Sequence, residues 1–403
     1  MAQLNGGLGT AAPTWNTSAN ILSDNMITAE VVSGYKSSSD TALQVTVRKS
    51  VPATISRAVS GTSTYTVTAT STAELVTSTT APSGSAAGQP CLVALSGTGS
   101  ISGAGSTYWT MPNCTVRSNG TVDVHGGGGP LSTAGIFAGG AVNIDTWIAT
   151  TGGQYPNDGT IADPYASNTA LQNAFTTAAG LTGTTNIACG SVGGVVGTAG
   201  QYTGNNNCNG TNTLPNGGSC VTSGGVTCTL YPGNYGSLTT SGGPYVFNLQ
   251  PGLYLFSGSI SLTNSTTTNG TGVTIISVGL FTGQNSFNFN VSAPTLVEAA
   301  NTGGIAGVVL ASKTSTTTTI SGNAAFNAAG VVYFPNAIFD ASGSSCNSST
   351  PCFGNNSTAC LEIIASSIKL TGNSNFSSTC STYGAATFTS TSGTSTTSAR
   401  VVQ

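Results

Sequence analysis

The sequence contains very few charged residues. Eight Lys or Arg and eleven Asp or Glu make up 5% of the 403 residues and give a formal net charge of −3, whereas about 25% of residues are charged in an average soluble protein. A nucleic-acid interface needs clustered cations that displace the counterions of the phosphates, and adjacent cations occur only at Arg48 and Lys49. We therefore expect no nucleic-acid partner, and this one pair is too little charge to hold an anionic membrane surface.

Histidine and long apolar runs are equally scarce. His125 is the single histidine, so the ten cysteines have few partners for metal sites, and no Cys-x-x-Cys motif occurs. The sequence as given has no signal peptide and no run of about 18 apolar residues, the length that a membrane-spanning helix needs. We expect disulfides formed in an oxidising compartment, no metal and no cofactor, and an export signal removed upstream of Met1.

Small and β-prone residues are abundant instead. There are 55 glycines, about twice the usual ~7% share, and Ser, Thr and Asn are also frequent. The apolar fraction of 38% is too high for a disordered chain. This composition favours strands joined by tight turns and disfavours helices.

A repeated phrase in residues 230–287 predicts the fold. Leu230-Tyr-Pro-Gly-Asn-Tyr235 recurs nineteen residues later as Leu249-Gln-Pro-Gly-Leu-Tyr254, and Leu262-Thr-Asn recurs as Phe281-Thr-Gly at the same interval. Related phrases follow at 320–323 and 370–373. A period near twenty, built from short β-prone runs and Gly or Asn turns, is typical of one coil of a β-solenoid.

We therefore predict an all-β chain with these parts. Residues 1–76 form a small antiparallel β module with a flexible arm, and 77–90 are a linker. Residues 91–385 form a right-handed parallel β-solenoid (β-helix) of roughly ten or more coils, each of about 20 residues. A disulfide-stapled loop insertion with a short helix interrupts it at 151–229. Residues 386–403 are a low-complexity tail, whose last residues are a candidate returning strand.

The N-terminal module carries half of the cations. Strands are expected at 27–33, 42–48 and 64–71, with a short helical turn within 51–60. One interpretation of the cations is a solvated strand edge guarded against pairing, and the other is a docking face for a neighbouring subunit. The four cations are Lys36, Arg48, Lys49 and Arg57.

Cysteine spacings give a second indication of the period. Adjacent coils stack about 4.8 Å apart, which suits a disulfide between cysteines one coil apart. This argument predicts Cys91–Cys114 and Cys360–Cys380 as links between coils, and Cys346–Cys352 as a loop bridge. It leaves the pairing of the remaining four open. These four are Cys189, Cys208, Cys220 and Cys228.

Carboxylates near the single histidine are the strongest catalytic candidates. Asp123 and His125 lie in one coil and Asp145 in the next, so the two carboxylates would stack beside the imidazole if the coils were in register. Glycosidases use paired carboxylates. The alternative is that they are outward polar positions of alternating strands, which we favour, and we therefore expect no catalytic residue.

Other acidic residues have structural interpretations. Asp158 and Asp163 lie in a turn-rich loop and suit Asx turns better than calcium binding. Glu298, Asp340 and Glu362 are isolated in the sequence.

Threonines and aromatic residues are candidates for surface contacts. The Thr-rich stretch Thr314–Thr319 has the composition of a flat ice-binding face, yet the sequence shows no T-x-T ladder across successive coils; exposed β-branched residues also suit ordinary strands. Trp109, Trp147 and Tyr155 are candidate stacking platforms for carbohydrate, and packing between coils is their alternative role.

A resemblance to a known family rests on six phrases in a fixed order. They are Pro90–Leu95, Leu249–Tyr254, Ser292–Pro294, Gly304–Leu310, Gly330–Ala337 and Cys360–Asn373. Together they resemble the extracellular part of TadG-like proteins of bacterial Tad/Flp (tight adherence) pilus systems, over roughly residues 40–385. Members of that family begin with a membrane-spanning, pseudopilin-like helix that has no counterpart here, and the 151–229 segment is larger than in the family pattern.

The resemblance implies a non-enzymatic structural or adhesive role on the bacterial cell surface, in pilus assembly and attachment. The expected partners are other pilus or surface subunits, carbohydrate or abiotic surfaces, and a membrane only through the missing helix. Two alternatives belong to other classes: a carbohydrate-active β-helix enzyme, lyase or hydrolase, and a Thr-rich protein that binds ice or another ordered surface.

Overall fold

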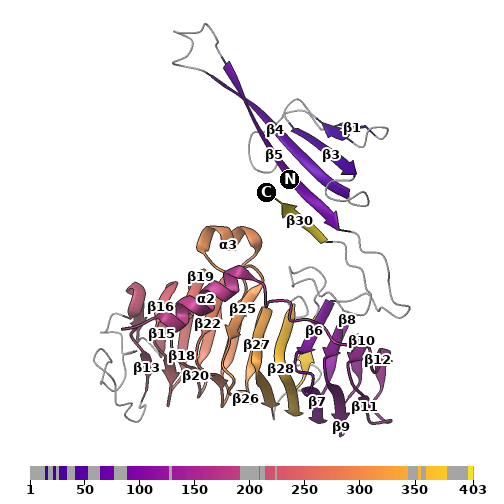
Figure 1. Ribbon diagram of the computed structural model, residues 1–403. Helices are drawn as coiled ribbons and strands as arrows, with labels where there is room; N and C mark the ends of the chain where they lie inside the picture. The colour runs from indigo at the N-terminus through magenta and orange to yellow at the C-terminus, as the bar shows by residue number, and fades with distance from the viewer. Residues whose placement is uncertain are drawn as a thin grey trace. The chain divides into compact units, whose positions relative to one another are not determined.

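The computed structural model contains two compact units, Met1–Ser83 with Gly393–Gln403 and Gly84–Ser392 (Figure 1). It describes residues 14–16, 21–23, 27–33, 41–52, 64–76, 89–126, 129–190, 208, 214–222, 225–343, 353–354, 360–378 and 398–402. The protein is mostly β, and the larger unit contains a large, predominantly parallel sheet. No helix of the described residues has the length and apolar character needed to cross a membrane.

The smaller unit is an antiparallel sheet in which each strand pairs with the next. Its order is β1 (Thr14–Asn16), β2 (Ile21–Ser23), β3 (Ile27–Ser33), β4 (Thr41–Pro52), β5 (Thr64–Val76) and β30 (Ser398–Val402). The strands predicted at 27–33, 42–48 and 64–71 are present. The prediction of a helical turn within 51–60 is wrong for its first two residues, because Val51 and Pro52 continue β4. Residues 53–60 lie outside the described part.

The end of the chain joins this sheet. β30 runs antiparallel to β5, with Ser398 opposite Val76 and Val402 opposite Thr72. The last residues are therefore a returning strand. They belong structurally with the N-terminal module, although the tail is predicted as a separate segment.

Two of the four cations lie where β4 loses its neighbour. β3 pairs with β4 only as far as Ile27 opposite Val47, so Arg48 and Lys49 follow on an edge that β3 does not cover, and both are exposed. This placement is that of a guarded strand edge. Lys36 and Arg57 lie outside the described residues.

The large sheet consists of three ladders of parallel strands, and most repeats contribute one strand to each. In ladder 1 the order is β16 (Gly233–Tyr235), β19 (Gly252–Phe256), β22 (Val273–Ser277), β25 (Val308–Ser312), the middle of β27 (Ala325–Gly343), the first half of β28 (Leu361–Gly372), β6 (Gln89–Ala94) and the later parts of β8 (Trp109–Ser118), β10 (Leu131–Ala138) and β12 (Thr150–Tyr155).

Ladder 2 is the surface discussed below. It comprises β13 (Ile187–Cys189), β17 (Leu238–Thr240), β20 (Ile260–Leu262), β23 (Phe281–Gly283), β26 (Thr318–Gly322), the ends of β27 and β28, β7 (Ser100–Gly105), β9 (Thr121–His125) and β11 (Val142–Ile144).

Ladder 3 completes each repeat. It comprises β15 (Val226–Leu230), β18 (Tyr245–Leu249), β21 (Thr267–Gly270), β24 (Asn288–Ser292), the start of β27, β29 (Phe376–Ser377) and the starts of β8, β10 and β12. β14 (Ser219–Val221) pairs antiparallel with β15, and the short 3-10 turn Pro215–Gly217 precedes it.

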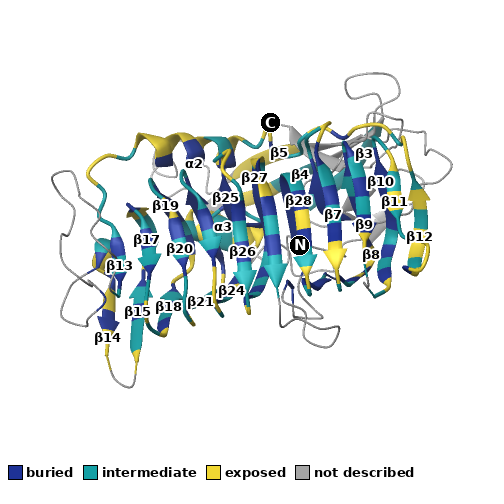
Figure 2. Cartoon of the chain, turned by 90° about the horizontal axis from the view of Figure 1, so that it is seen from below, coloured by how far each residue is buried: buried dark blue, intermediate teal, exposed yellow. Residues whose placement is uncertain are grey.

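Period-two alternation explains why these short strands form. In ladder 2, Leu238, Ile260 and Phe281 are in register and buried, whereas the residue after each of them points outward. Buried residues of all three ladders belong to one hydrophobic cluster. Figure 2 shows the alternation of buried and intermediate positions along the strands. A single repeat cannot bury its apolar side alone, so the stack is the stable unit.

The spatial order of the repeats differs from their order in the chain. β28, near the C-terminal end of the larger unit, pairs with β6 and β7, and β29 pairs with β8. The N-terminal repeats of 89–155 therefore continue the stack beyond 361–378. The sequence predicts the coils of 91–385 in chain order, interrupted at 151–229. The structure places them in another order, because hydrophobic periodicity identifies a repeat but not which repeat lies beside it.

Residues 156–186, which we call the strap, connect the two ends of this arrangement. They leave β12, which pairs only with β10, and lead to β13 at the other end of ladder 2. α2 (Thr169–Gly180) lies across the ladder strands within the strap (Figure 1). The predicted insertion of 151–229 is thus too wide: β12, β13 and β15 within that range are ladder strands.

The strap covers the outer side of ladder 1. Phe175 and other buried strap residues form a second hydrophobic cluster with ladder 1 residues such as Ile276 and Tyr333. This cover explains why strands such as β22 and β25 are buried at every position, as is usual for parallel strands packed on both faces. α3 (Leu296–Thr302) is a further short helix between β24 and β25.

Candidate functional site

The outer surface of ladder 2 carries hydroxyl groups in register on four successive repeats. Thr239 pairs with Ser261, Ser261 with Thr282, and Thr282 with Thr319. All four residues are half-buried, and they alternate with core residues, so their side chains face outward. We call them the hydroxyl column. Adjacent parallel strands lie about 4.8 Å apart, so the column is a regular row of short polar groups.

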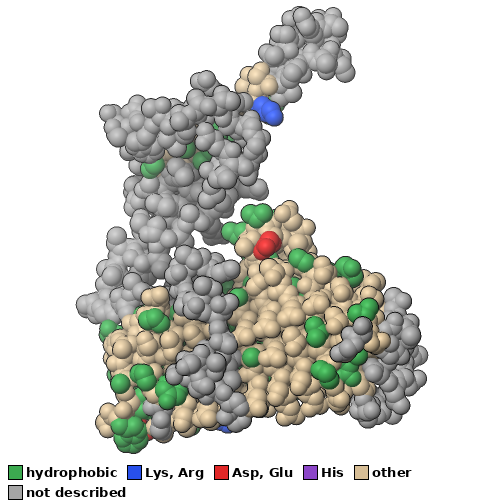
Figure 3. Space-filling model, turned by 180° about the vertical axis from the view of Figure 1, so that it is seen from behind, with side chains coloured by type: hydrophobic (Ala, Val, Ile, Leu, Met, Phe, Trp, Pro, Cys, Tyr) green, Lys and Arg blue, Asp and Glu red, His purple; other side chains and the backbone are tan. Residues whose placement is uncertain are grey.

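The charged side chains described on the outer surface of ladder 2 take part in ion pairs or hydrogen bonds. Beyond Thr319 the same position is held by Asp340 and then Lys369, whose carboxylate and ammonium groups lie 3.2 Å apart. Ser102, Asp123 and Asn143 follow in register. The side seen from behind in Figure 3 is also nearly uncharged over its described part. Contacts of this unit with other molecules must therefore rely mainly on hydrogen bonds and packing.

The three residues considered for catalysis belong to two separate hydrogen-bonded pairs at the end of ladder 2, Asp123 with Asn143 and His125 with Asp145. Asp123 accepts hydrogen bonds from Thr121 and from the Asn143 amide, the latter at 2.6 Å. His125 Nδ1 lies 2.9 Å from Asp145 Oδ1. Asp123 is opposite Asn143 in the strand pairing, so the two carboxylates do not stack as the sequence analysis considers.

The environment of Asp145 stabilises its charged form. The hydrogen bond with His125, and a second one from the Gly126 amide at 2.9 Å, hold the pKa of the Asp145 carboxyl below its usual value. The His125 side chain is 58% exposed. An ionised carboxylate that orients an exposed imidazole is one part of a general acid–base site. The other carboxylate on this face, Asp123, lies two residues before His125 in β9 and bonds Thr121 and Asn143.

Trp147 lies next to this pair and is far more exposed than Trp109. Its side chain is 69% exposed, and its indole N–H donates to the carbonyl of Gly126 at 2.8 Å, which fixes the ring. Trp109 is fully buried in the core, so the stacking interpretation is wrong for it. Tyr155 stacks on Phe137 with ring centroids 4.6 Å apart. Of the three candidates, Trp147 therefore offers a free aromatic face.

The remaining acidic candidates have structural partners, with one exception. Asp163 accepts a hydrogen bond from the Tyr165 amide, as in an Asx turn, and Asp158 pairs with Arg117 at 3.5 Å. Glu298 forms a capping box with Thr295 at the start of α3. The exception is Glu362. It is fully buried, and neither carboxylate oxygen has a hydrogen-bond partner.

The stretch Thr314–Thr319 does not form a flat threonine face by itself. Only its last two residues lie in β26, where Thr318 is buried and Thr319 faces outward. The hydroxyl column instead takes one residue from each repeat. The sequence analysis missed it because the column mixes Thr with Ser and its members are 21, 22 and 37 residues apart along the chain.

Ladder 3 carries an asparagine ladder that the sequence analysis also missed. Asn248, Asn269, Asn290 and Asn327 are in register. Each amide donates to the carbonyl oxygen of the previous one, at 3.2, 3.2 and 2.9 Å. Because these amides bond one another, we assign them to stabilisation of the stack. The only local hint of this ladder in the sequence is the Asn-Phe-Asn pattern of residues 288–290.

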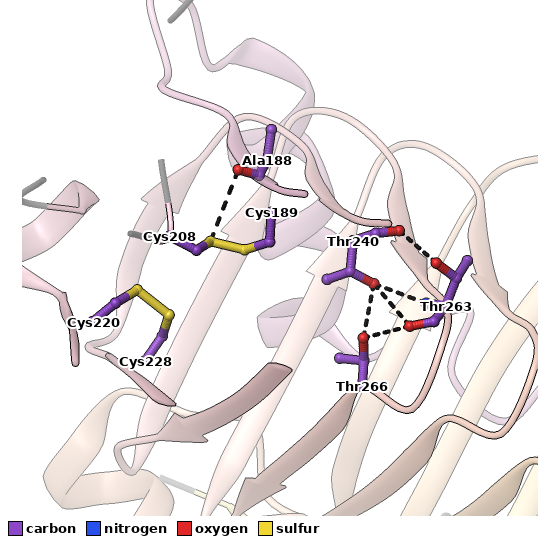
Figure 4. The surroundings of a disulfide bond; sticks show 8 residues. All are labelled: Ala188, Cys189, Cys208, Cys220, Cys228, Thr240, Thr263 and Thr266. Carbon is purple, nitrogen blue, oxygen red and sulfur yellow. Dashed lines mark hydrogen bonds between the residues drawn. A yellow bond between two sulfur atoms is a disulfide. The ribbon is translucent and has the colours of Figure 1, made fainter. Parts of the chain in front are cut away.

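Three disulfides join pairs of cysteines that both lie in the described part of the larger unit. Cys91 bonds to Cys114, which is the link between repeats that the spacing predicts. The pairing left open among four cysteines is Cys189–Cys208 and Cys220–Cys228 (Figure 4). Cys360 is disulfide-bonded, but its expected partner Cys380 lies outside the described residues, as do Cys346 and Cys352.

The two bonds drawn in Figure 4 lie close together. The sulfur atoms of Cys208, Cys220 and Cys228 are within 4.8 Å of one another. Thiolates in this arrangement would suit a soft metal ion, but sulfur atoms in disulfides are not metal-binding thiolates. Three disulfides are typical of proteins from oxidising compartments.

The chain matches no protein-family model, no curated protein and no solved structure. The resemblance to TadG-like proteins therefore rests on the six ordered phrases alone.

Proposed function

We propose that the protein is a non-enzymatic extracellular component of bacterial surface attachment, associated with a Tad/Flp-type pilus. We propose further that the three ladders are the faces of one parallel β-solenoid. The shared core of the ladders supports the solenoid, and the three disulfides support a location outside the cytosol. The six ordered phrases support the pilus association.

The hydroxyl column is the observation that supports the attachment role best. Ladder 1 is covered by the strap and the amides of ladder 3 bond one another, whereas the hydroxyls of ladder 2 face outward without a covering segment among the described residues. Thr side chains have restricted χ1 rotamers, so little conformational entropy is lost when the row contacts a surface. A polysaccharide or abiotic surface with matching hydrogen-bonding groups is the expected target.

The experiment compares two variants with bulky substitutions on different ladders. Ser261→Tyr with Thr282→Tyr interrupts the hydroxyl column, and Val246→Tyr with Thr267→Tyr makes the matched change at two adjacent, in-register residues of ladder 3. Retention on cellulose, chitin and glass is measured for wild type and both variants. We expect a loss of at least about tenfold for the ladder 2 variant only, since several hydrogen bonds are lost together. Equal retention of all three proteins contradicts the role of ladder 2.

The same column favours a second candidate, binding to ice. A regular row of hydroxyl groups about 4.8 Å apart is a repeating pattern that an ordered water lattice can meet. Inhibition of ice recrystallisation by the wild type, lost in the ladder 2 variant and kept in the ladder 3 variant, would favour this function. Retention on polysaccharide without any effect on ice growth favours the attachment role instead.

The enzyme alternative depends on the pair His125–Asp145. A cavity of about 780 Å³ lies elsewhere, lined by α3 residues such as Leu296 and strap residues such as Ala170, and it does not include this pair. The test is release of reducing ends or unsaturated products from polysaccharides. Activity that Asp145→Asn abolishes would contradict the non-enzymatic proposal.

A further inference from the structure

The β4–β5 hairpin extends beyond the other strands of the small sheet. β30 covers the outer edge of β5 only from Thr72 to Val76. On that edge, residues 64–71 have no strand partner among the described residues. Residues 66–71 are all exposed, and Val67 is 56% exposed. A two-stranded ribbon exposed on both faces is only marginally stable in water, so this segment is expected to gain stability from another strand.

The two edges of the ribbon differ in their protection. The β4 edge carries Arg48, Lys49 and Pro52, and cations and proline are the residues that prevent edge-to-edge pairing. Residues 65–71 of β5 contain neither charge nor proline and alternate Thr with Tyr, Val, Ala and Ser. One edge is therefore guarded and the other is open to a further strand.

We propose that residues 65–71 of β5 pair with the same residues of a second copy of this chain, antiparallel, about a two-fold axis at Thr68. A two-fold axis between antiparallel strands keeps each side chain on its own face of the sheet, so one residue must lie opposite itself. With Thr68 at the centre, the whole open segment is used and β30 stays in place. The partner is a second copy because this register is self-complementary, as an isologous interface requires.

In this register, hydroxyl side chains lie opposite hydroxyl side chains on one face of the sheet, and apolar side chains lie opposite each other next to the axis on the other face. Thr66 lies opposite Thr70 of the other copy, and Val67 lies opposite Ala69. Thr–Thr and apolar cross-strand pairs are favourable. The cations do not oppose this arrangement: Arg48 lies opposite Thr68 within the hairpin, so the two Arg48 residues are separated by three strand spacings, about 14 Å, which exceeds the Debye length of about 8 Å at physiological salt.

A cysteine at the axis tests the register directly. In full-length Thr68→Cys, the two new thiols face each other across the axis, and oxidation should give a covalent dimer on a non-reducing gel. In the matched variant Thr70→Cys, the two thiols are offset by four residues, about 14 Å along the strands, which is too far for a disulfide. We expect a cross-link only at position 68. Absence of a cross-link at 68, or equal cross-linking at both positions, overturns the proposal.

Charge substitutions test whether the partner is a second copy. By analytical ultracentrifugation, the wild type should be dimeric, and Thr68→Lys and Thr68→Glu should each be monomeric because like charges meet at the axis. A mixture of the two variants should form dimers again. Ser50→Lys, on the guarded edge, should remain dimeric, and circular dichroism verifies folding. A monomeric wild type, or a mixture that stays monomeric, overturns the proposal and leaves the edge to a different subunit.

Discussion

Ile363 in β28 pairs with Leu92 in β6, although the two residues lie near opposite ends of the larger unit's sequence. Both side chains are fully buried in the common core. The junction between them, which we call the seam, is formed by parallel strand pairs in all three ladders. The strands that meet at the seam are far apart in the sequence, so the stability of the seam depends on contacts between distant segments.

Substitutions at the seam test this order of repeats. Leu92→Ala and Ile363→Ala should each lower the free energy of unfolding by about 2–5 kcal/mol, the range for buried large-to-small changes. Because the residues are neighbours, the double variant should deviate from additivity by about 0.5–3 kcal/mol. Urea unfolding of the single and double variants measures both quantities. Leu92→Ala combined with Ile260→Ala, which is remote from the seam, should be additive, and additivity at the seam itself contradicts the order.

Glu362 should make the protein less stable as the pH rises. Burial without a hydrogen-bond partner raises the pKa of the Glu362 carboxyl well above its usual value. In the unfolded chain the same carboxyl has a pKa of about 4.3. Above that pH the unfolded chain has released the proton, whereas the folded protein still keeps it. The folded state then binds more protons, and the free energy of unfolding falls with increasing pH above about 4.3.

Glu362→Gln removes this dependence. The variant should match the wild type near pH 4 and exceed its free energy of unfolding at pH 8, measured by urea unfolding across that range. Asp145→Asn is a contrast, because the Asp145 pKa is lowered in the folded state; stability from that carboxylate is present above its unfolded pKa and is lost as the pH falls. A wild type and Glu362→Gln variant with parallel pH profiles contradict the prediction.

The strap should depend on the hydrogen bond from Tyr333 to Asp163. The phenol is buried in ladder 1 and donates to the carboxylate of the strap at 2.6 Å. Tyr333→Phe keeps the packing against Phe175 but leaves the carboxylate without this donor, which should cost about 1.5–3 kcal/mol as for other bonds to charged groups. Limited proteolysis should then cleave within 156–186 sooner, whereas Thr176→Ala, on the exposed side of α2, should leave the cleavage rate unchanged.

Local signals predicted the parts of the fold that depend on neighbouring residues. The alternation in 42–48 and 64–71 identified a hairpin, and the nineteen-residue echo placed Leu230 opposite Leu249, as the structure has them. After the following turn the echo aligns Tyr235 with Tyr254, but the strands pair Tyr235 with Phe256. The connections 231–232 and 250–251 are equally long, so the offset of two residues arises because β16 pairs with the end of β19 and not with its start. The repeated phrase in the sequence does not reveal that offset.

The order of repeats and the candidate surface depend on information that no local pattern contains. Every repeat presents a similar apolar side, so the periodicity of the sequence does not reveal that β6 lies against β28. The hydroxyl column requires the true register at each turn. His125 and Asp145 were considered together because they are about one repeat apart, and they do form a pair. A stack of Asp123 on Asp145 was considered but not favoured, and Asp123 bonds Asn143.

Two buried threonines should respond in opposite ways to the same substitution. Thr268 is in register with Phe247 and Phe289 in the core, and its hydroxyl has no hydrogen-bond partner. Thr266 is also buried, but its hydroxyl is hydrogen-bonded to the Thr240 hydroxyl at 2.9 Å and to the Thr263 carbonyl at 2.6 Å (Figure 4).

Valine has nearly the shape of threonine without the hydroxyl. Thr268→Val removes a buried polar group that bonds nothing, so it should raise the free energy of unfolding by about 1–2 kcal/mol. Thr266→Val should lower it by about 1–3 kcal/mol, because partners of the hydroxyl are left unsatisfied. Urea unfolding of the two variants measures both changes. A loss of stability in Thr268→Val as large as that in Thr266→Val would show that the Thr268 hydroxyl has a partner, and that the core at this position is polar rather than apolar.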